Sequence, residues 1–152
     1  MKTFFSFFII FLFINTVTGQ NVHRIKNFNV DKSTLAIEGY DPVAYFISKK
    51  GMEGKKDISL ISEGITYHFS TVQNRELFKA NPSKYEPQFG GWCSYAMGEN
   101  GDKVAADPET FKILNGKLYL FYNKFFNNTL KGWDKNENVL KQKAEQNWAK
   151  FK

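Results

Sequence analysis

The sequence is poorest in cysteine, because Cys93 is the only one in 152 residues. An internal disulfide and a C-x-x-C redox pair are therefore excluded. Histidine is almost as rare, with only His23 and His68, so the paired ligands of a closed structural zinc site are missing as well. Neither a glycine-rich phosphate loop nor a G-x-S-x-G nucleophile elbow occurs. These absences leave no enzyme signature, and the sequence favours a protein that is not an enzyme.

Long apolar runs are also scarce, and the clear example lies at the start of the chain. Residues 4–14 form an apolar run, and the small residues Val17 and Gly19 follow at the positions that a signal peptidase reads. This pattern predicts a secretory signal peptide over residues 1–19. We therefore expect an exported protein, periplasmic or secreted in a bacterial setting, with no membrane span left after cleavage.

The charge balance is basic but scattered. The formal net charge is +6, and many lysines stand beside acidic residues instead of forming a basic stripe. A nucleic-acid-binding face would need such a stripe, so we expect no nucleic-acid partner. Nothing in the charge pattern indicates an oligomeric state.

Two stretches predict β-hairpins. In residues 58–69 apolar residues alternate on either side of a turn at Glu63-Gly64. In residues 111–122 two apolar segments flank Asn115-Gly116, the pair that type I′ turns prefer. The second segment of that hairpin is apolar on both faces, which predicts a central, covered strand.

Helices are predicted between and after the hairpins. Ser70 with Gln73 forms a capping box for a helix that Asn81-Pro82 ends, and Asp107-Pro108 resembles another helix start. A C-terminal amphipathic helix is expected to be capped by acidic residues and to present one apolar face; these residues are Asp134 and Glu137 for the cap, and Leu140, Ala144, Trp148 and Phe151 for the face.

Together these elements predict an α+β fold. A small antiparallel sheet built from hairpins would be packed by short helices and the C-terminal amphipathic helix. Residues 20–35 show no period and are expected to form an extended leader, and residues 36–152 are expected to form a single domain.

Three segments carry a resemblance to a known family: "GYDPVAYF", "ITYHFSTVQNRELFKANPSKYEPQFGGWC" and "FKILNGKLYLFYN". They resemble the YHS domain proteins, in particular the exported bacterial branch, which is related to TRASH-like metal-handling domains. In the metal-binding members, three thiols would fall on Ala44 and near Ser70 and Asn74, and all three are absent here. The resemblance instead implies that the thiol of the exported branch corresponds to Cys93.

Cys93 is therefore the leading candidate for chemistry. If "WCSYAMG" forms a short helix after Gly90-Gly91, Cys93 in its first turn would be favoured as a thiolate. Met97 lies one helical turn later, and thiolate with thioether suits Cu(I). His68 could serve as a third metal ligand or as a base.

Three functions stay open at this point. The first is binding of a soft metal, copper as Cu(I) in particular, through an exposed-loop thiol at Cys93 with Met97 and His68 as further ligands. The second is thiol redox or peroxide chemistry on a small thiol-reactive ligand, with Cys93 as nucleophile and His68 as base. The third is a non-catalytic partner-binding domain in which Cys93 packs. The isolated thiol and its spacing to Met97 favour the first.

Overall fold

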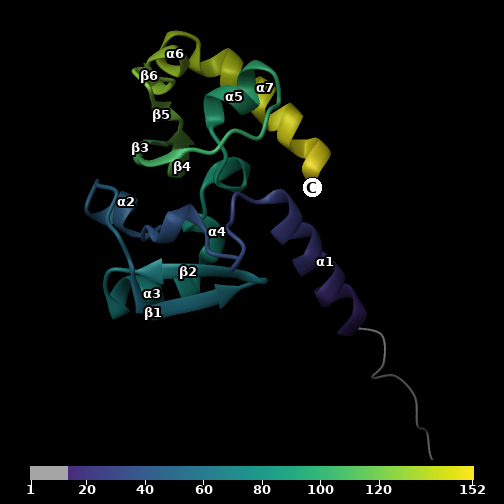
Figure 1. The fold of residues 1–152 in the computed structure, drawn as a ribbon, viewed down its shortest axis with the longest axis vertical. Helices are drawn as coiled ribbons and strands as arrows, with labels where there is room; N and C mark the ends of the chain where they lie inside the picture. The colour runs from purple at the N-terminus through teal and green to yellow at the C-terminus, as the bar shows by residue number, and fades with distance from the viewer. Residues whose placement is uncertain (1–13) are drawn as a thin grey trace, which may run out of the picture.

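The strands of the protein form hairpins, as the alternating sequence pattern predicts. The computed structural model describes residues 14–152. Residues 1–13, which make up most of the predicted signal peptide, lie outside the described residues. Within the described part, three two-stranded antiparallel sheets occur (Figure 1): β1 Lys55–Ser62 with β2 Ile65–Phe69, β3 Asp107–Leu114 with β4 Lys117–Phe121, and β5 Asn123–Lys124 with β6 Asn127–Asn128. The α+β fold is confirmed.

Short helices pack on these hairpins, and a longer helix lies near each end of the described chain (Figure 1). The helices are α1 Ile14–Asn27, α2 Ala44–Ile47, α3 Val72–Ala80, α4 Pro82–Tyr85, α5 Ser94–Glu99, α6 Leu130–Lys135 and α7 Glu137–Trp148, with 3-10 turns at Ile37–Gly39, Gln88–Gly91 and Ala149–Phe151. No helix among residues 14–152 is long and apolar enough to cross a membrane.

Strand β4 joins two apolar clusters and is the central element of the fold. Leu118 and Leu120 belong to a cluster that also contains the inner face of β2 and the residues that α2, α3 and α4 bury. Tyr119 and Phe121 point to the opposite face and pack with residues of α5, α6 and α7. Because successive side chains of a strand alternate between faces, one strand serves both clusters. The prediction that this strand is covered is confirmed, since all four residues are buried, but it is not central in its sheet, because β3 is its only strand neighbour there among the described residues.

The segment that begins at residue 20 is helical up to Asn27, where an extended leader was expected. Helix α1 runs to Asn27 and is held against the domain by polar contacts. Arg24 forms ion pairs with Glu63 at 3.0 Å and with Glu86 at 2.7 Å. The indole of Trp92 donates to the carbonyl of Asn27 at 2.7 Å. The expectation of extended structure is therefore wrong for residues 20–27, because these long-range contacts stabilise the helix.

Two helix starts differ from the sequence prediction. Helix α3 is capped by Thr71, whose hydroxyl accepts from the amide of Asn74 at 3.1 Å, and not by Ser70. Asp107-Pro108 begins strand β3 and not a helix. Asp107 pairs with Phe121 while the next pairing joins Phe111 to Leu120, so residues 108–110 form a bulge. A bulge tolerates Pro108 because it requires no amide donor for the ladder.

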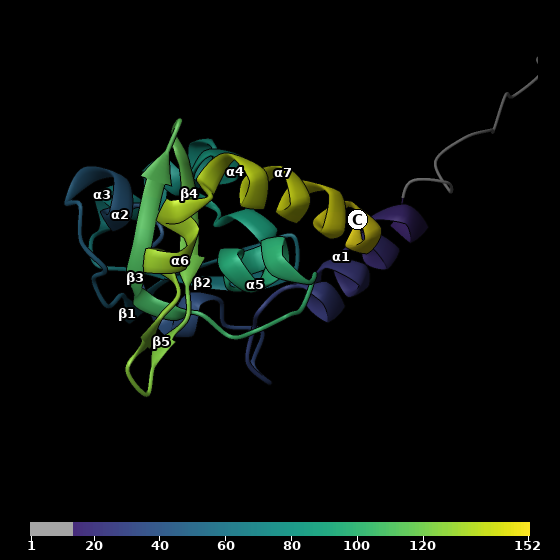
Figure 2. The same cartoon turned by 90° about the horizontal axis from the view of Figure 1, so that it is seen from above.

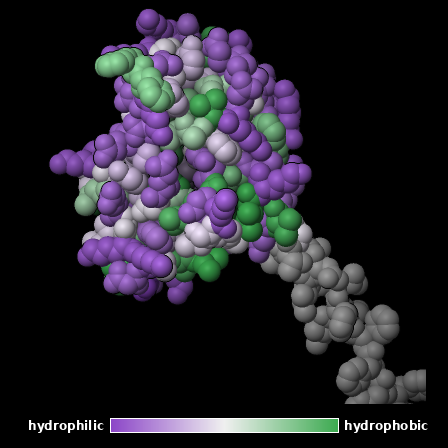
Figure 3. Space-filling model, viewed as in Figure 1, coloured by the Kyte–Doolittle hydropathy of each residue, from purple (hydrophilic) through white to green (hydrophobic). Residues whose placement is uncertain are grey.

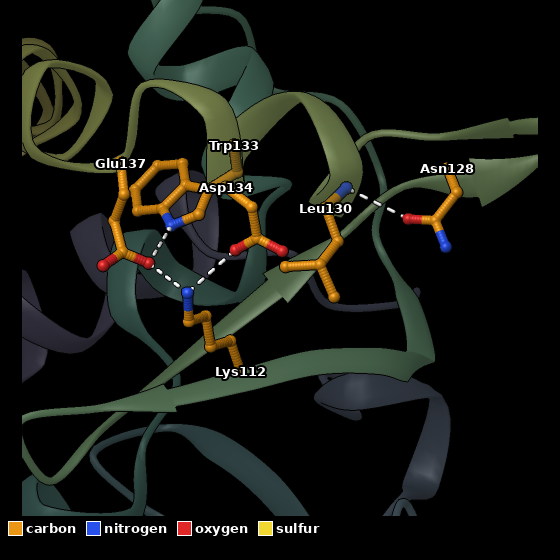
Figure 4. A network of polar contacts seen from close by, with 6 residues as sticks. All are labelled: Lys112, Asn128, Leu130, Trp133, Asp134 and Glu137. Atoms are coloured by element: carbon orange, nitrogen blue, oxygen red, sulfur yellow. Dashed lines mark hydrogen bonds and ion pairs between the residues drawn. The ribbon is translucent and has the colours of Figure 1, made fainter.

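The C-terminal helix is divided in two at Asn136, whose backbone is not helical (φ −139°, ψ 33°). Asp134 and Glu137 do not cap it as predicted, because both carboxylates bind Lys112 of β3 (Figure 4). These two hydrogen bonds, that to Asp134 first, raise the pKa of Lys112. The predicted apolar face is confirmed for Leu140, Ala144 and Trp148, which are buried, whereas Phe151 is half-buried.

A buried carboxylate links the start of α2, the end of β2 and the start of α3. Asp41 is fully buried and accepts five hydrogen bonds. Its Oδ1 accepts from the amides of Val43 at 2.8 Å and Ala44 at 3.3 Å. Its Oδ2 accepts from the Ser70 amide at 2.8 Å, the Ser70 hydroxyl at 2.6 Å and the Asn74 side-chain amide at 2.7 Å.

Replacing Asp41 is expected to destabilise the protein strongly. Asp41→Ala leaves several buried donors without an acceptor, and we expect a loss of about 3–5 kcal/mol in the free energy of unfolding. Asn74→Ala removes one donor from the same carboxylate and serves as the milder comparison, with an expected loss of about 1 kcal/mol. Urea denaturation followed by circular dichroism measures both. Equal, small losses for the two variants would contradict a central role for this carboxylate.

Candidate functional site

Cys93 lies in the interior of the protein and not in an exposed loop. Its side chain is fully buried, its amide donates to the carbonyl of Val104 at 2.8 Å, and it bridges to Leu120 of β4. It is the residue before α5 and does not enter the first helical turn. The expected exposed-loop thiol is therefore corrected: backbone pairing on β4 pulls the segment after Gly90-Gly91 into the core.

The buried thiol of Cys93 has one partner for its sulfur as hydrogen-bond acceptor and one for its S–H as donor. The amide of Tyr122 donates to Cys93 Sγ at 3.3 Å, and Sγ lies 3.4 Å from Thr129 Oγ1. Because the Thr129 hydroxyl donates to the carbonyl of Tyr122 at 2.8 Å, its oxygen is left to accept from the thiol. A neutral thiol thus satisfies all of these groups.

The partners of Cys93 give the thiol a structural task. Tyr122 directly precedes β5 and Thr129 directly follows β6, so the two residues form the base of the β5–β6 hairpin. The Thr129 amide also donates to the Tyr122 carbonyl at 3.0 Å, which closes this base. Cys93 therefore fastens both ends of the hairpin to the start of α5.

The two other predicted ligands serve other parts of the fold. Met97 is fully buried in the cluster formed with α6 and α7, and its carbonyl accepts from Asn147 at 2.9 Å. His68 pairs with Ser59 across the β1–β2 hairpin and lies beside Gly39 and Gly54. Figure 1 shows β2 and the β4–β5 junction in opposite halves of the molecule. Among residues 14–152, no group of three or more His, Cys, Asp or Glu side chains is placed to hold a metal ion.

The positions that the resemblance aligns with metal-binding thiols do lie together in space. Ala44, Ser70 and Asn74 all donate hydrogen bonds to the Asp41 carboxylate. In this chain the cluster consists of one buried acceptor and its donors. Since both carboxylate oxygens are occupied by these donors, the cluster is a hydrogen-bonded network and offers no soft ligand.

The most unusual exposed feature is one that the sequence patterns did not indicate. Phe125 and Phe126 form the two-residue turn of the β5–β6 hairpin, and their side chains are 89% and 110% exposed. Both have positive φ, 52° and 64°. A sequence signal existed, because an apolar pair with asparagines on either side ("NKFFNN") follows a predicted strand. Its turn potential was hidden by the absence of glycine.

A cleft in the described part of the protein lies away from the predicted ligands. This cleft, of about 350 Å³, lies between α1 and the C-terminal turn and is lined by Gln20, His23, Arg24, Asn27, Phe28, Trp148, Phe151 and Lys152. Cys93, Met97 and His68 are absent from this lining. The cleft is consequently not part of the predicted thiol site.

Comparison with protein-family models, with curated proteins and with solved structures found no match.

We expect Cys93 to be inert in the native protein. Reaction with the thiol reagent DTNB should be slow and should follow the rate at which the structure opens, because Sγ is buried and hydrogen-bonded. The same thiol should react at once in denaturant. Rapid reaction of the native protein would contradict the burial and would restore the exposed-thiol hypothesis.

Removal of the thiol should loosen the hairpin base selectively. Cys93→Ala leaves the Tyr122 amide without its partner, and we expect a loss of about 1–3 kcal/mol together with faster hydrogen exchange at that amide. A matching measurement at amides of the β1–β2 hairpin provides the control, because that hairpin does not touch Cys93. Equal acceleration in both hairpins would contradict a local fastening role.

Proposed function

We propose that the protein is a non-catalytic binding domain that presents Phe125 and Phe126 to a partner from a fixed hairpin. The observation that carries this proposal is the two-residue turn built from two exposed phenylalanines in the left-handed region. Neither side chain contributes to the apolar clusters that stabilise the fold. The pair therefore has no packing role that would explain it.

The conformational cost of this turn supports the proposal. The turns of the other two described hairpins, Glu63-Gly64 and Asn115-Gly116, also have positive φ at both residues, but each ends in glycine. Glycine adopts this region without steric cost, whereas other L-residues lose about 1–2 kcal/mol there. A turn that costs conformational free energy and exposes apolar surface does not stabilise the fold. Binding to a partner gives such a turn a role that folding does not.

The base of the hairpin supports the proposal as well, because it holds the tip in place. The side-chain amide of Asn123 donates to Thr110 Oγ1 of β3 at 3.0 Å. Asn128 Oδ1 accepts from the amide of Leu130 at 3.1 Å, which joins β6 to α6 (Figure 4). Together with Cys93 beneath the base, these contacts pre-organise the tip and reduce the ordering cost of binding.

Copper binding remains a weaker proposal for this chain. A soft metal at Cys93 would have to displace the Tyr122 amide and the Thr129 hydroxyl from a buried thiol. Thiol redox chemistry meets the same barrier, since a buried thiol is screened from its oxidant. Membership of the YHS family also stays a proposal, and the meeting of Ala44, Ser70 and Asn74 at Asp41 supports it.

A turn exchange tests whether the phenylalanines serve folding or binding. We expect the double variant F125N/F126G to be more stable than the wild type by about 1–3 kcal/mol, because it relieves the positive-φ strain and removes little packing. The reciprocal variant N115F/G116F, which places the same pair in the β3–β4 turn, should be destabilised by a similar amount. Denaturant unfolding measures both. A destabilised F125N/F126G would show that the pair is structural and would overturn the proposal.

The same variant tests binding itself. Wild type and F125N/F126G are used as matched baits in an extract of the host, and the retained proteins and lipids are identified by mass spectrometry. We expect at least one identified component to be retained by the wild type and lost with the variant. Identical sets from both baits would contradict a binding role for the tip.

A further inference from the structure

The hairpin tip also indicates the class of its partner. We infer that Phe125 and Phe126 insert into the interface of an anionic lipid bilayer, so that the protein attaches to a membrane surface through the β5–β6 hairpin. This inference rests on the proposed function and adds the partner to it. The argument uses the shape of the tip, the charge around it and its position on the molecule.

The tip is convex and apolar at its end only. Both phenylalanine side chains project into solvent from a turn of two residues, and the strands beneath them carry Asn123, Asn127 and Asn128. In the view of Figure 3, apolar atoms project from the outline at the end of the molecule where β5 and β6 lie in Figure 1. A fluid bilayer accepts such a wedge without a pre-shaped cavity, and the neutral asparagines suit the polar headgroup layer.

The charges next to the tip are positive. The segment from Tyr122 to Trp133 contains Lys124 and Lys131 and no acidic residue. Both lysines are exposed, and none of the salt bridges among residues 14–152 engages either of them. A lysine beside an inserted aromatic residue attracts anionic headgroups at short range.

Two acidic residues near the hairpin base, Asp134 in α6 and Asp107 opposite Phe121, already bind other groups of the protein, and only Asp134 is paired with a positive charge. Asp134 binds Lys112 at 2.8 Å. Asp107 accepts from the amide of Glu109 and the hydroxyl of Thr110, both at 2.9 Å. The net charge of +6 adds long-range attraction to a negative surface. Lipid of negative charge therefore complements both the tip and the whole molecule.

The position of the tip leaves room for a flat surface. Figure 2 shows the β5–β6 turn projecting from one side of the molecule, with the β3–β4 turn at the opposite side. The exposed Lys117 beside that second turn offers a matched control. Lys117→Glu and Lys124→Glu change the net charge equally, but only the latter changes the charge at the proposed insertion site.

Co-sedimentation with lipid vesicles tests the inference. The vesicles contain phosphatidylcholine and phosphatidylglycerol in equal parts, and pure phosphatidylcholine vesicles are compared. We expect the wild type to bind the anionic vesicles about tenfold or more tightly than F125N/F126G and than Lys124→Glu, and binding should weaken as salt is added. Lys117→Glu should bind nearly as the wild type does. Circular dichroism confirms that each variant is folded.

Several results would overturn the inference. Failure of the wild type to bind anionic vesicles would do so, as would equal binding of F125N/F126G. Equal losses for Lys117→Glu and Lys124→Glu would indicate unspecific attraction and not insertion. If sedimentation equilibrium instead shows a dimer that F125N/F126G abolishes, the occupant is a second copy of the chain. The matched-bait experiment separates this inference from the proposed function. If it identifies a protein that the wild type retains and F125N/F126G does not, the tip still serves binding, although its partner is not a lipid bilayer.

Discussion

The buried carboxylate of Asp41 is the interaction on which the arrangement of the first half of the domain depends. It accepts hydrogen bonds from the start of α2, from the end of β2 and from α3, which are far apart in the chain. A buried carboxylate is tolerated only where its oxygens are fully hydrogen-bonded, so the three segments must meet in one geometry. The aromatic residues of β2 and α3 can then pack against one another, as Phe69 and Phe78 do at a centroid separation of 5.3 Å.

Strand β4 connects this first half to the second half of the domain, because it packs in both apolar clusters. Its residues alternate between the cluster organised near Asp41 and the cluster of the C-terminal helices. Cys93 pairs alongside β4, and its thiol contacts the residues on either side of the β5–β6 hairpin. A series of buried contacts therefore runs from the core to the base of an exposed aromatic turn. Such support makes the turn a fixed element, which suits recognition better than a mobile loop does.

The structure assigns Cys93 a different role from the one that the sequence suggested. Its isolation in the sequence and its spacing to Met97 suggested a soft-metal ligand. In the structure the thiol behaves as a small hydrogen-bonding core residue, and Met97 fills apolar space in the same half of the molecule. The proposed function consequently moves from the sulfur to the surface element that the sulfur holds in place.

Local sequence determined the hairpins over residues 58–69 and 111–122 and the helix that ends at Asn81-Pro82. Alternation, turn residues and caps act between neighbours in the chain, so they can be interpreted without the fold. The glycine-free turn at Phe125-Phe126 was missed because its conformation contradicts the residue preferences on which such interpretation depends.

Only the tertiary structure decided the roles of the polar and sulfur-containing side chains. Ser70 and Asn74 satisfy Asp41 across about thirty residues of sequence, a partnership that no local pattern encodes. Lys112 likewise draws Asp134 and Glu137 away from the capping role predicted for them. Burial of Cys93 follows from pairing with β4, which is set by the packing of both clusters. In all three cases the partner is set by where the fold places the groups and not by their neighbours in the chain. For the buried groups of Asp41 and Cys93 this is decisive, because a buried hydrogen-bonding group must find a partner.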